Sequence, residues 1–184
     1  EKRLLPWIRE ERVFEAQPSA YWATYVFRVL QERGYAADVV RFIRKHWEPM
    51  ADYGSTWENF APRRGADSFS HAWSAHPIAH FAQILGGVTQ TGPAWTAIRF
   101  APALLTDSGR VRIPTPQGMI SSAWRRRGDG AFDVRLQLPP GTEAEIVLPR
   151  TRALCRGGVH RWQVLRGNTD DATLSGPAPY GAAS

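Results

Sequence analysis

The stretch "YGSTWENFAP", residues 53–62, places one carboxylate among three aromatic side chains. Glu58 follows Trp57 directly, and Tyr53 and Phe60 lie on either side of this pair. Hydrolysis of a glycosidic bond uses carboxylates beside that bond, and aromatic rings suit the C–H faces of sugars. The residue types therefore fit a catalytic acid or base that faces a sugar. They also fit a packing tryptophan beside a solvated glutamate, and the pattern alone favours this second interpretation.

Three histidines follow this loop, and their spacing raises the question of a metal site. His76 and His80 are four residues apart, as zinc ligands on one helix face can be, and His71 lies just upstream. Pro77 lies between the pair, no H-E-x-x-H glutamate is present, and no third ligand is evident. We therefore expect no metal and no cofactor, with one histidine acting as a hydrogen-bonding group in a polar pocket.

Covalent catalysis is the third chemistry that the side chains raise. Cys155 is the only cysteine, so no intrachain disulfide can form, and its spacing from His160 matches no nucleophile motif. A serine hydrolase would need a G-x-S-x-G elbow, which is absent around the serines near His71, namely Ser68, Ser70 and Ser74. The sequence gives little support to either nucleophile.

Helices are expected to carry these residues in the first half of the chain. Before residue 90, apolar residues recur three and four apart, which is the helical period. "SAYWATYVFRVLQERG" predicts a helix that ends before Gly34, and "AADVVRFIRKHW" predicts a second one that Pro49 stops. The short gap between them predicts an antiparallel hairpin. The apolar stripe of the first helix comprises Tyr21, Tyr25, Val29 and Leu30, with Ala23 and Phe27 nearby.

A third helix, "WSAHPIAHFAQILGG", is expected to hold Pro77 in its first turn and to end at Gly86-Gly87. After "TQTGPAW" the apolar period becomes two, and short strands alternate with turn signals. These signals are Asp107-Ser108-Gly109, Gly128-Asp129-Gly130, Pro139-Pro140-Gly141 and Gly157-Gly158. Strands at this spacing predict an antiparallel β-sandwich, and the small, polar residues of the last stretch predict a loose tail.

The charge of the chain is basic, with 23 Lys and Arg against 17 Asp and Glu, a net charge of +6 and a pI near 10.1. The basic residues are scattered, and the one dense run, Arg125-Arg126-Arg127, is interpreted as a solvated face rather than a nucleic-acid site. No stretch reaches the ~20 apolar residues of a membrane span. The charged start, "EKRLLPWIREER", is not that of a signal peptide, so the compartment stays open between bacterial cytoplasm and periplasm or exterior.

Several short motifs occur in an order that resembles one enzyme family. They are "HWEPM", the G-x-T-W-E of "GSTWE", the S-x-x-H-x-W-S of "SFSHAWS", and the G-x-I-x-S-x-W of "GMISSAW". Together, over roughly residues 20 to 165, they resemble the C-terminal portion of bacterial α-L-rhamnosidases, which are glycoside hydrolases of family 78 and six-hairpin glycosidases. The resemblance implies an (α/α)6 barrel and hydrolysis that inverts the anomeric centre.

The resemblance also implies roles for three residues. Glu58 matches the general base that activates water, His71 matches a position that lines the sugar site, and Trp57 becomes a wall of the pocket. The family's general acid lies upstream in the barrel and has no counterpart in this chain. Ser70 also stands where the family commonly has Asn, which leaves the preferred sugar open.

The expected fold is mixed α+β. Residues 1–90 are expected to be the last helices of a six-hairpin barrel, residues 91–167 a β-sandwich, and residues 168–184 a flexible tail. The expected function is that of a rhamnosidase fragment that carries the base but not the acid and is inactive alone. The alternative is a non-catalytic β-sandwich that binds carbohydrate or supports the barrel. The expected partners are a carbohydrate substrate and either a second copy or another chain that completes the barrel, without nucleic acid or membrane.

Overall fold

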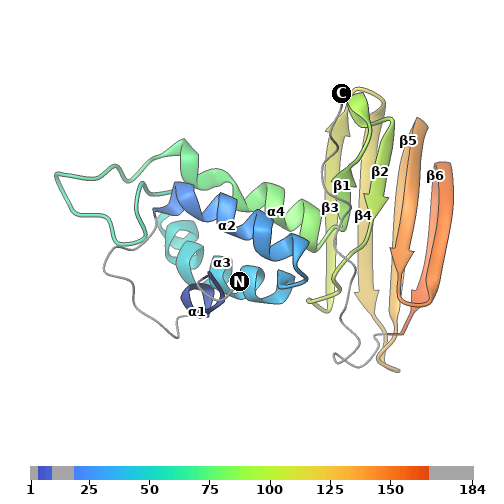
Figure 1. Ribbon diagram of the computed structural model, residues 1–184, viewed down its shortest axis with the longest axis horizontal. Helices are drawn as coiled ribbons and strands as arrows, with labels where there is room; N and C mark the ends of the chain where they lie inside the picture. The colour runs from blue at the N-terminus through green and yellow to red at the C-terminus, as the bar shows by residue number, and fades with distance from the viewer. Residues whose placement is uncertain (1–3, 10–18, 166–184) are drawn as a thin grey trace. The chain divides into compact units, whose positions relative to one another are not determined.

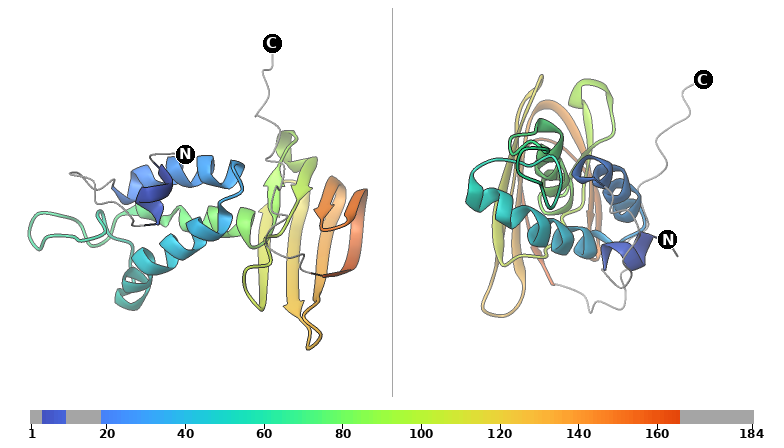
Figure 2. Two further views of the ribbon diagram at one scale, coloured as in Figure 1. Left: turned by 60° about the horizontal axis from the view of Figure 1, so that its bottom comes forward. Right: turned by 90° about the vertical axis from the view of Figure 1, so that its left-hand side faces the viewer.

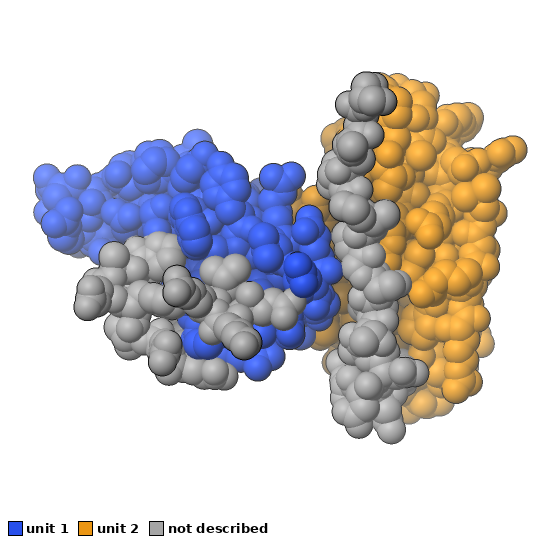
Figure 3. Space-filling view, in the orientation of Figure 1, with its two compact units in different colours: residues 1–78, 171–184 blue, residues 79–170 orange. Residues whose placement is uncertain are grey.

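A computed structural model describes residues 4–9 and 19–165, which fall into two compact units (Figures 1 and 3). The first unit contains the described residues up to Ile78, and the second begins at Ala79. The first is helical and the second is mostly β-sheet, so the expected mixed α+β class is confirmed. The tail expected over residues 168–184 lies outside the described residues.

The first unit begins with a short helix, α1 (Leu4–Ile8), and the longer α2 (Ala20–Glu32). Ser19 caps α2, because its hydroxyl accepts a hydrogen bond from the Trp22 N–H at 3.2 Å. Gly34 follows the helix end with a φ of 85°, as a glycine in the left-handed region should. The apolar stripe divides between core and solvent. Ala23, Phe27 and Leu30 are buried, whereas Tyr21, Tyr25 and Val29 remain exposed.

The next helix, α3 (Ala36–Tyr53), runs past the proline that was expected to stop it. Pro49 lies inside α3, where it removes one backbone donor but leaves the rest of the turn intact. Buried Trp47 and Met50 hold the chain on both sides of it. The helix ends at Gly54, whose φ is 94° and whose N–H reaches the carbonyls of Met50 and Ala51. The prediction at Pro49 was therefore wrong by one turn.

Aromatic contacts form the core of this helical hairpin, whose two helices are seen in Figure 2. Phe27 of α2 contacts Phe42 and Trp47 of α3, with ring centroids 5.8 and 6.1 Å apart. Phe60, from the loop after α3, packs edge-on against Trp47 at 4.9 Å. This last contact anchors the loop that carries Glu58 to the hairpin.

The third helical segment consists of a 3₁₀ turn, η1 (Ala72–Ala75), and α4 (Pro77–Ile84). Pro77 is the first residue of α4, as expected, because that position needs no N–H. The helix ends before Gly86 and Gly87, which was also predicted. Gly87 has a φ of 70°, and a Cβ on it would lie 2.1 Å from the backbone nitrogen of Pro102. Only glycine fits this approach.

The second unit is one six-stranded sheet with the order β1-β2-β5-β4-β3, in which β6 also pairs with β5. Its strands are β1 (Val88–Gln90), β2 (Ala97–Phe100), β3 (Ser108–Thr115), β4 (Gly118–Arg126), β5 (Phe132–Leu148) and β6 (Thr151–Val164). A 3₁₀ turn, η2 (Pro93–Trp95), precedes β2. All pairs are antiparallel except β2 with β5, which are parallel.

The expected antiparallel sandwich is corrected to a single curled, mixed sheet (Figure 2). The cause lies at Pro139-Pro140-Gly141, which was expected to be a turn between two strands. Here β5 continues through a bulge, with a register shift between Leu138 and Glu143. Its first half pairs with β4 and its second half with β2. Gly157-Gly158, which was also expected to be a turn, lies within β6 beside this bulge.

Both halves of β5 contribute to one core, which explains the curl. Phe132, Val134, Leu136 and Leu138 are buried before the bulge, as the alternation predicted, and Ala144, Ile146 and Leu148 are buried after it. Burial of each large side chain stabilises the fold by about 2 kcal/mol. The chain reverses at Pro149 and Arg150, where a φ of 60° at Arg150 follows a proline, as in a type II turn.

Candidate functional site

The loop between α3 and η1 is held closed by hydrogen bonds between its two arms, residues 55–59 and 67–71. The Glu58 N–H donates to the Ser68 carbonyl at 2.9 Å, and the His71 N–H donates to the Thr56 carbonyl at 2.7 Å. The Thr56 hydroxyl returns a bond to the His71 carbonyl at 2.7 Å. These contacts fix the backbone at Glu58 and His71, so the side chains of these two residues project from a defined frame.

An ion pair closes the far end of the same loop. The carboxylate of Asp67 accepts hydrogen bonds from the Arg63 N–H at 2.7 Å and from its guanidinium at 3.2 Å, and Asn59 donates to the other oxygen. These donors lower the pKa of Asp67 below its ordinary value, with the Arg63 side chain as the largest cause. Asp67 is therefore a structural carboxylate in the loop.

Glu58 is half-buried, and one of its carboxylate oxygens is anchored. Oε2 accepts a hydrogen bond from the Ser68 N–H at 2.8 Å. Among the described residues no side chain or backbone group donates to Oε1. A carboxylate held by one oxygen, with the other available, is the arrangement that a general base needs to accept a proton from water.

His71 stacks on Trp73, with ring centroids 3.9 Å apart and an interplanar angle of 25°. Its Nδ1 accepts a hydrogen bond from the Trp73 N–H at 3.4 Å. A nitrogen that accepts a hydrogen bond carries no proton, so the neutral ring carries its proton on Nε2. That N–H is a donor suited to a hydroxyl group.

Trp73 is the residue that links the predicted site residues to each other, and it was not singled out by the sequence reasoning. Its indole Nε1 donates to the Glu58 carbonyl at 3.0 Å while its ring stacks on His71. Trp73 is 36% exposed. The signal was present in the S-x-x-H-x-W-S motif, whose tryptophan is this residue.

Trp57 is half-buried and packs against two aromatic neighbours. Its ring contacts Tyr53 at 5.7 Å and Phe69 at 5.8 Å in edge-on arrangements. The Ser74 hydroxyl donates to its carbonyl at 2.5 Å. The indole Nε1 is buried with no hydrogen-bond partner among the described residues. Trp57 is thus close to Glu58 in the chain but packs mainly as a structural aromatic.

An exposed aromatic surface extends from this loop onto α2. Tyr21 lies 5.5 Å from Trp73, with the rings tilted by 31°. Tyr25 contacts Tyr21 edge-on, and their hydroxyls are 2.9 Å apart. Tyr21 is 43% exposed and Tyr25 is 47% exposed. His71, Trp73, Tyr21 and Tyr25 therefore form a continuous row of rings beside Glu58, which we call the aromatic row.

The other histidines have structural contacts. His76 Nε2 donates to the Ala20 carbonyl at 2.8 Å, and burial lowers the pKa of His76 below its ordinary value, against a smaller rise from this bond. His80 is buried. Among the described residues, no three His, Cys, Asp or Glu side chains lie close enough to hold a metal ion.

The nucleophile interpretations find no support in the contacts. Cys155 packs against the core of the sheet, and burial raises the pKa of its thiol, which is the opposite of activation. The hydroxyls of Ser68 and Ser74 donate to the backbone carbonyls of Ser70 and Trp57. Neither hydroxyl forms a hydrogen bond with the ring of His71.

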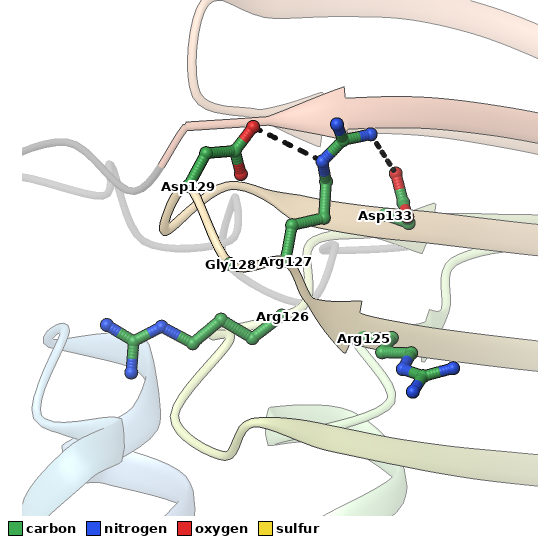
Figure 4. A pocket seen from close by; sticks show the side chains of 6 residues that line it. All are labelled: Arg125, Arg126, Arg127, Gly128, Asp129 and Asp133. Atoms are coloured by element: carbon green, nitrogen blue, oxygen red, sulfur yellow. Dashed lines mark ion pairs between the residues drawn. The ribbon is translucent and has the colours of Figure 1, made fainter.

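The dense basic run lies at the β4–β5 turn, where it lines a hollow of about 520 Å³ (Figure 4). Arg126 pairs with Asp107 at 3.2 Å. Arg127 pairs with Asp129 at 3.3 Å and with Asp133 at 3.6 Å. Two of its three arginines are thus neutralised locally, whereas Arg125 extends away from both. No helix in the described part of the chain is long and apolar enough to cross a membrane.

Comparisons with known structures identify the fold. The Bacillus sp. GL1 GH78 rhamnosidase is 29% identical, with a TM-score of 0.59, over 71% of this chain and 15% of that one. The Streptomyces avermitilis α-L-rhamnosidase, solved with L-rhamnose, is 20% identical, with a TM-score of 0.65, over 76% and 17%. The enzyme from Dictyoglumus thermophilum is 19% identical, with a TM-score of 0.66, over 80% and 20%. No curated protein sequence matches the chain.

The fold is therefore one found in glycoside hydrolases of the α-L-rhamnosidase class, and the chain spans between 15% and 20% of the length of these three enzymes. Within it, residues 87–163 match the family described as bacterial alpha-L-rhamnosidase C-terminal domain. The matched segment coincides with the curled sheet of the second unit. The resemblance to the C-terminal portion of GH78 rhamnosidases is thereby confirmed.

Proposed function

We propose that this chain is part of an inverting, α-L-rhamnosidase-like glycoside hydrolase in which Glu58 is the general base. The observation that carries the proposal is the Glu58 carboxylate, with Oε2 held by the Ser68 N–H at 2.8 Å and Oε1 available. The match of residues 87–163 to the bacterial alpha-L-rhamnosidase C-terminal domain supports the reaction class. The substrate class is a terminal α-linked rhamnose or a related sugar.

In this mechanism Glu58 takes a proton from a water molecule as that water attacks the anomeric carbon. The water approaches from the face opposite the leaving group, so the anomeric centre inverts. A second carboxylate, about 6.5–9.5 Å from the first, must protonate the leaving oxygen. No residue of this chain is assigned that role, so an acid from outside these 184 residues completes the pair and the chain alone is inactive.

His71 and Trp57 form the sugar side of the site in this proposal. The Nε2–H of His71 donates to a sugar hydroxyl, since Nδ1 is occupied by the Trp73 N–H. Trp57 forms the wall behind the base, packed on Tyr53 and Phe69. The paired arms of the loop keep these groups in place before the substrate arrives, which lowers the entropic cost of catalysis.

The helices of the first unit are proposed to be the last ones of an (α/α)6 barrel. The exposed stripe on α2 supports this, because Tyr21, Tyr25 and Val29 are each more than 40% exposed. Such a surface is suited to packing against another helix. We propose that this surface is covered either by the rest of the barrel or by a second chain.

The test uses the longest natural protein that contains this chain and an aryl α-L-rhamnoside as substrate. Glu58→Gln should reduce kcat by about 10²- to 10⁴-fold, the usual contribution of a general base. Asp52→Asn, which changes an exposed carboxylate near the end of α3, should leave kcat unchanged. Azide should restore product formation in Glu58→Ala, giving a glycosyl azide of inverted configuration. Unchanged rates in Glu58→Gln would remove Glu58 from the mechanism.

The second candidate function concerns the curled sheet alone, as a non-catalytic module that binds carbohydrate or supports the barrel. The observation that favours binding is a hollow of about 500 Å³ over β4, β5 and β6 that includes Arg125, Arg135 and Arg161. The test measures glycan binding by the whole chain that carries Glu58→Gln, the catalytically silent form. Binding by this variant would separate carbohydrate binding from hydrolysis.

A further inference from the structure

The strand register gathers on one face of the second unit several arginines that are scattered in the sequence. The pairings Arg110↔Ala123, Ala123↔Arg135 and Arg135↔Arg161 form one row across β3, β4, β5 and β6. Side chains alternate between the two faces of a strand, and the core takes the other face. Arg112 and Arg125 lie in the neighbouring rows. We call Arg110, Arg112, Arg125, Arg135 and Arg161, all of them exposed, the outer arginine face.

The charges of this face are not balanced within the part of the chain that the structure describes. None of its five arginines forms an ion pair there, and Arg135 donates only to the neutral Gln137 side chain at 3.1 Å. The one acid in these rows, Asp133, lies opposite Arg125 but is paired with Arg127. The outer arginine face is therefore a concentrated patch of positive charge.

The other half of the same sheet shows a different arrangement. There Arg99 of β2 lies directly opposite Glu145 of β5. Arg156 of β6 pairs with Glu143 at 2.8 Å. Arg99 and Arg156 are thus matched with acids across the strands, whereas no arginine of the outer arginine face is.

The register also places like charges against each other. Arg135 and Arg161 are direct cross-strand partners, and like charges in that position destabilise a sheet. On its other side Arg135 faces the small Ala123, which leaves room over the sheet. The hollow of about 500 Å³ lies here, with Gln163 also in its lining. The like-charge pair lowers the stability of the sheet, and it lies beside an open hollow. This combination is typical of a binding site in which a ligand supplies the missing opposite charge.

We propose that the outer arginine face binds an acidic polysaccharide whose sugar rings carry carboxylates. The planar guanidinium fork of arginine matches a carboxylate with two parallel hydrogen bonds. Ser121, Gln137 and Gln163 lie among the arginines and supply donors and acceptors for hydroxyl groups. Trp124 and Trp162 also line the hollow, but they belong to the alternate rows that pack on the core, so the three rows themselves offer no aromatic side chain on which nucleic-acid bases could stack. A carboxylated glycan therefore fits the face better than a single-stranded nucleic acid does.

The site does not involve Glu58, and it goes beyond the proposed hydrolysis. It would hold the protein on an acidic polymer while a separate site acts on a terminal sugar. Binding by the chain, together with unchanged hydrolysis in the Glu58→Gln variant of the longer natural protein, would leave this inference standing and remove the proposed role of Glu58. Loss of hydrolysis in that variant, without binding of the acidic oligomer by the chain, would do the reverse.

The experiment measures binding of the full chain to oligogalacturonate by calorimetry, with the fully methyl-esterified oligomer as the uncharged match. Binding should require free carboxylates and should weaken as salt rises. Arg135→Gln with Arg161→Gln should reduce the affinity by about tenfold or more, since two charge-assisted contacts are lost. This double variant should fold, because it removes a like-charge pair.

The matched control is Arg156→Gln. Arg156 is an exposed arginine of β6, the strand that also carries Arg161, and it already forms an ion pair with Glu143. Its affinity for oligogalacturonate should stay within about twofold of the wild type, as is usual for a surface charge engaged elsewhere. Equal binding of the esterified oligomer, or an equal loss in Arg156→Gln, would overturn the proposal. Stronger binding to a DNA fragment of the same charge would also overturn it, in favour of a nucleic-acid face.

Discussion

The indole Nε1 of Trp73 donates a hydrogen bond to the backbone carbonyl of Glu58 at 3.0 Å. Because the same ring stacks on His71, one tryptophan contacts two of the three residues that the family resemblance assigns to the site. Trp57, the neighbour of Glu58 in the chain, has a buried Nε1 without such a partner in the described residues. The two tryptophans therefore support the loop in different ways.

This difference predicts unequal effects of the same substitution. Trp73→Phe removes a hydrogen bond and should destabilise the loop by about 1 kcal/mol more than the loss of ring area alone. Trp57→Phe loses no hydrogen bond, so its cost should come from packing only. Thermal unfolding and kcat/KM of the parent enzyme should both be measured. Equal losses of kcat/KM in the two variants would contradict a positioning role for Trp73.

The motif order and the apolar periods were enough to predict the mixed fold, but not the way in which the sheet closes. The strand at "FDVRLQL" was predicted with the correct buried face, because alternation is a local property. At Pro139-Pro140-Gly141 the local signal for a turn was misleading. Pairing of β5 with β2 and β6 after the bulge carries the strand onward, and such non-local contacts leave no trace in a short stretch of sequence.

The candidate site, like the sheet, could be predicted only where the sequence signal is local. Glu58 and His71 were predicted from motif order, whereas Trp73 required knowledge of which side chain reaches the Glu58 carbonyl across the loop. The exposed state of Tyr21 and Tyr25 was also hidden, because the helical period marks an apolar stripe without saying what covers it. The outer arginine face depends on strand register, which scattered positions in the sequence do not reveal.

Two glycines with positive φ give a second prediction, because a Cβ would meet neighbouring atoms at only one of them. Gly87→Ala places a Cβ 2.1 Å from the Pro102 nitrogen and also strains a φ of 70°. Gly65→Ala strains a φ of 79° but meets nothing within 4 Å. The strain alone costs about 1–2 kcal/mol, so Gly65→Ala should lose roughly that much. Gly87→Ala should lose clearly more, as measured by chemical denaturation, and a similar loss in both would show that the Pro102 segment can move.

The pH dependence of stability should carry a contribution from His76. Burial lowers its pKa in the folded state below the ordinary 6.5, so the unfolded chain binds a proton more readily. Stability should therefore be full above pH 6.5 and should fall as the pH decreases below it, until the folded form is also protonated. His76→Gln should reduce this fall between pH 7 and pH 5 in thermal melts. An unchanged slope would assign the dependence to other groups.

The stripe of Tyr21, Tyr25 and Val29 on α2 predicts the behaviour of the chain in isolation. Each of these side chains is more than 40% exposed, and Trp22 beside them is 46% exposed. An apolar face of this kind is usually covered, so the chain alone should self-associate or bind the segment that completes the barrel.

Tyr25→Lys with Val29→Glu should shift the chain toward the monomer, because charges oppose burial of the face. Ile78→Lys, at a residue that is 75% exposed and outside the stripe, is the control and should leave the distribution unchanged. Sedimentation velocity at several concentrations measures the effect, and a monodisperse wild-type monomer would contradict both the association and the barrel assignment of α2.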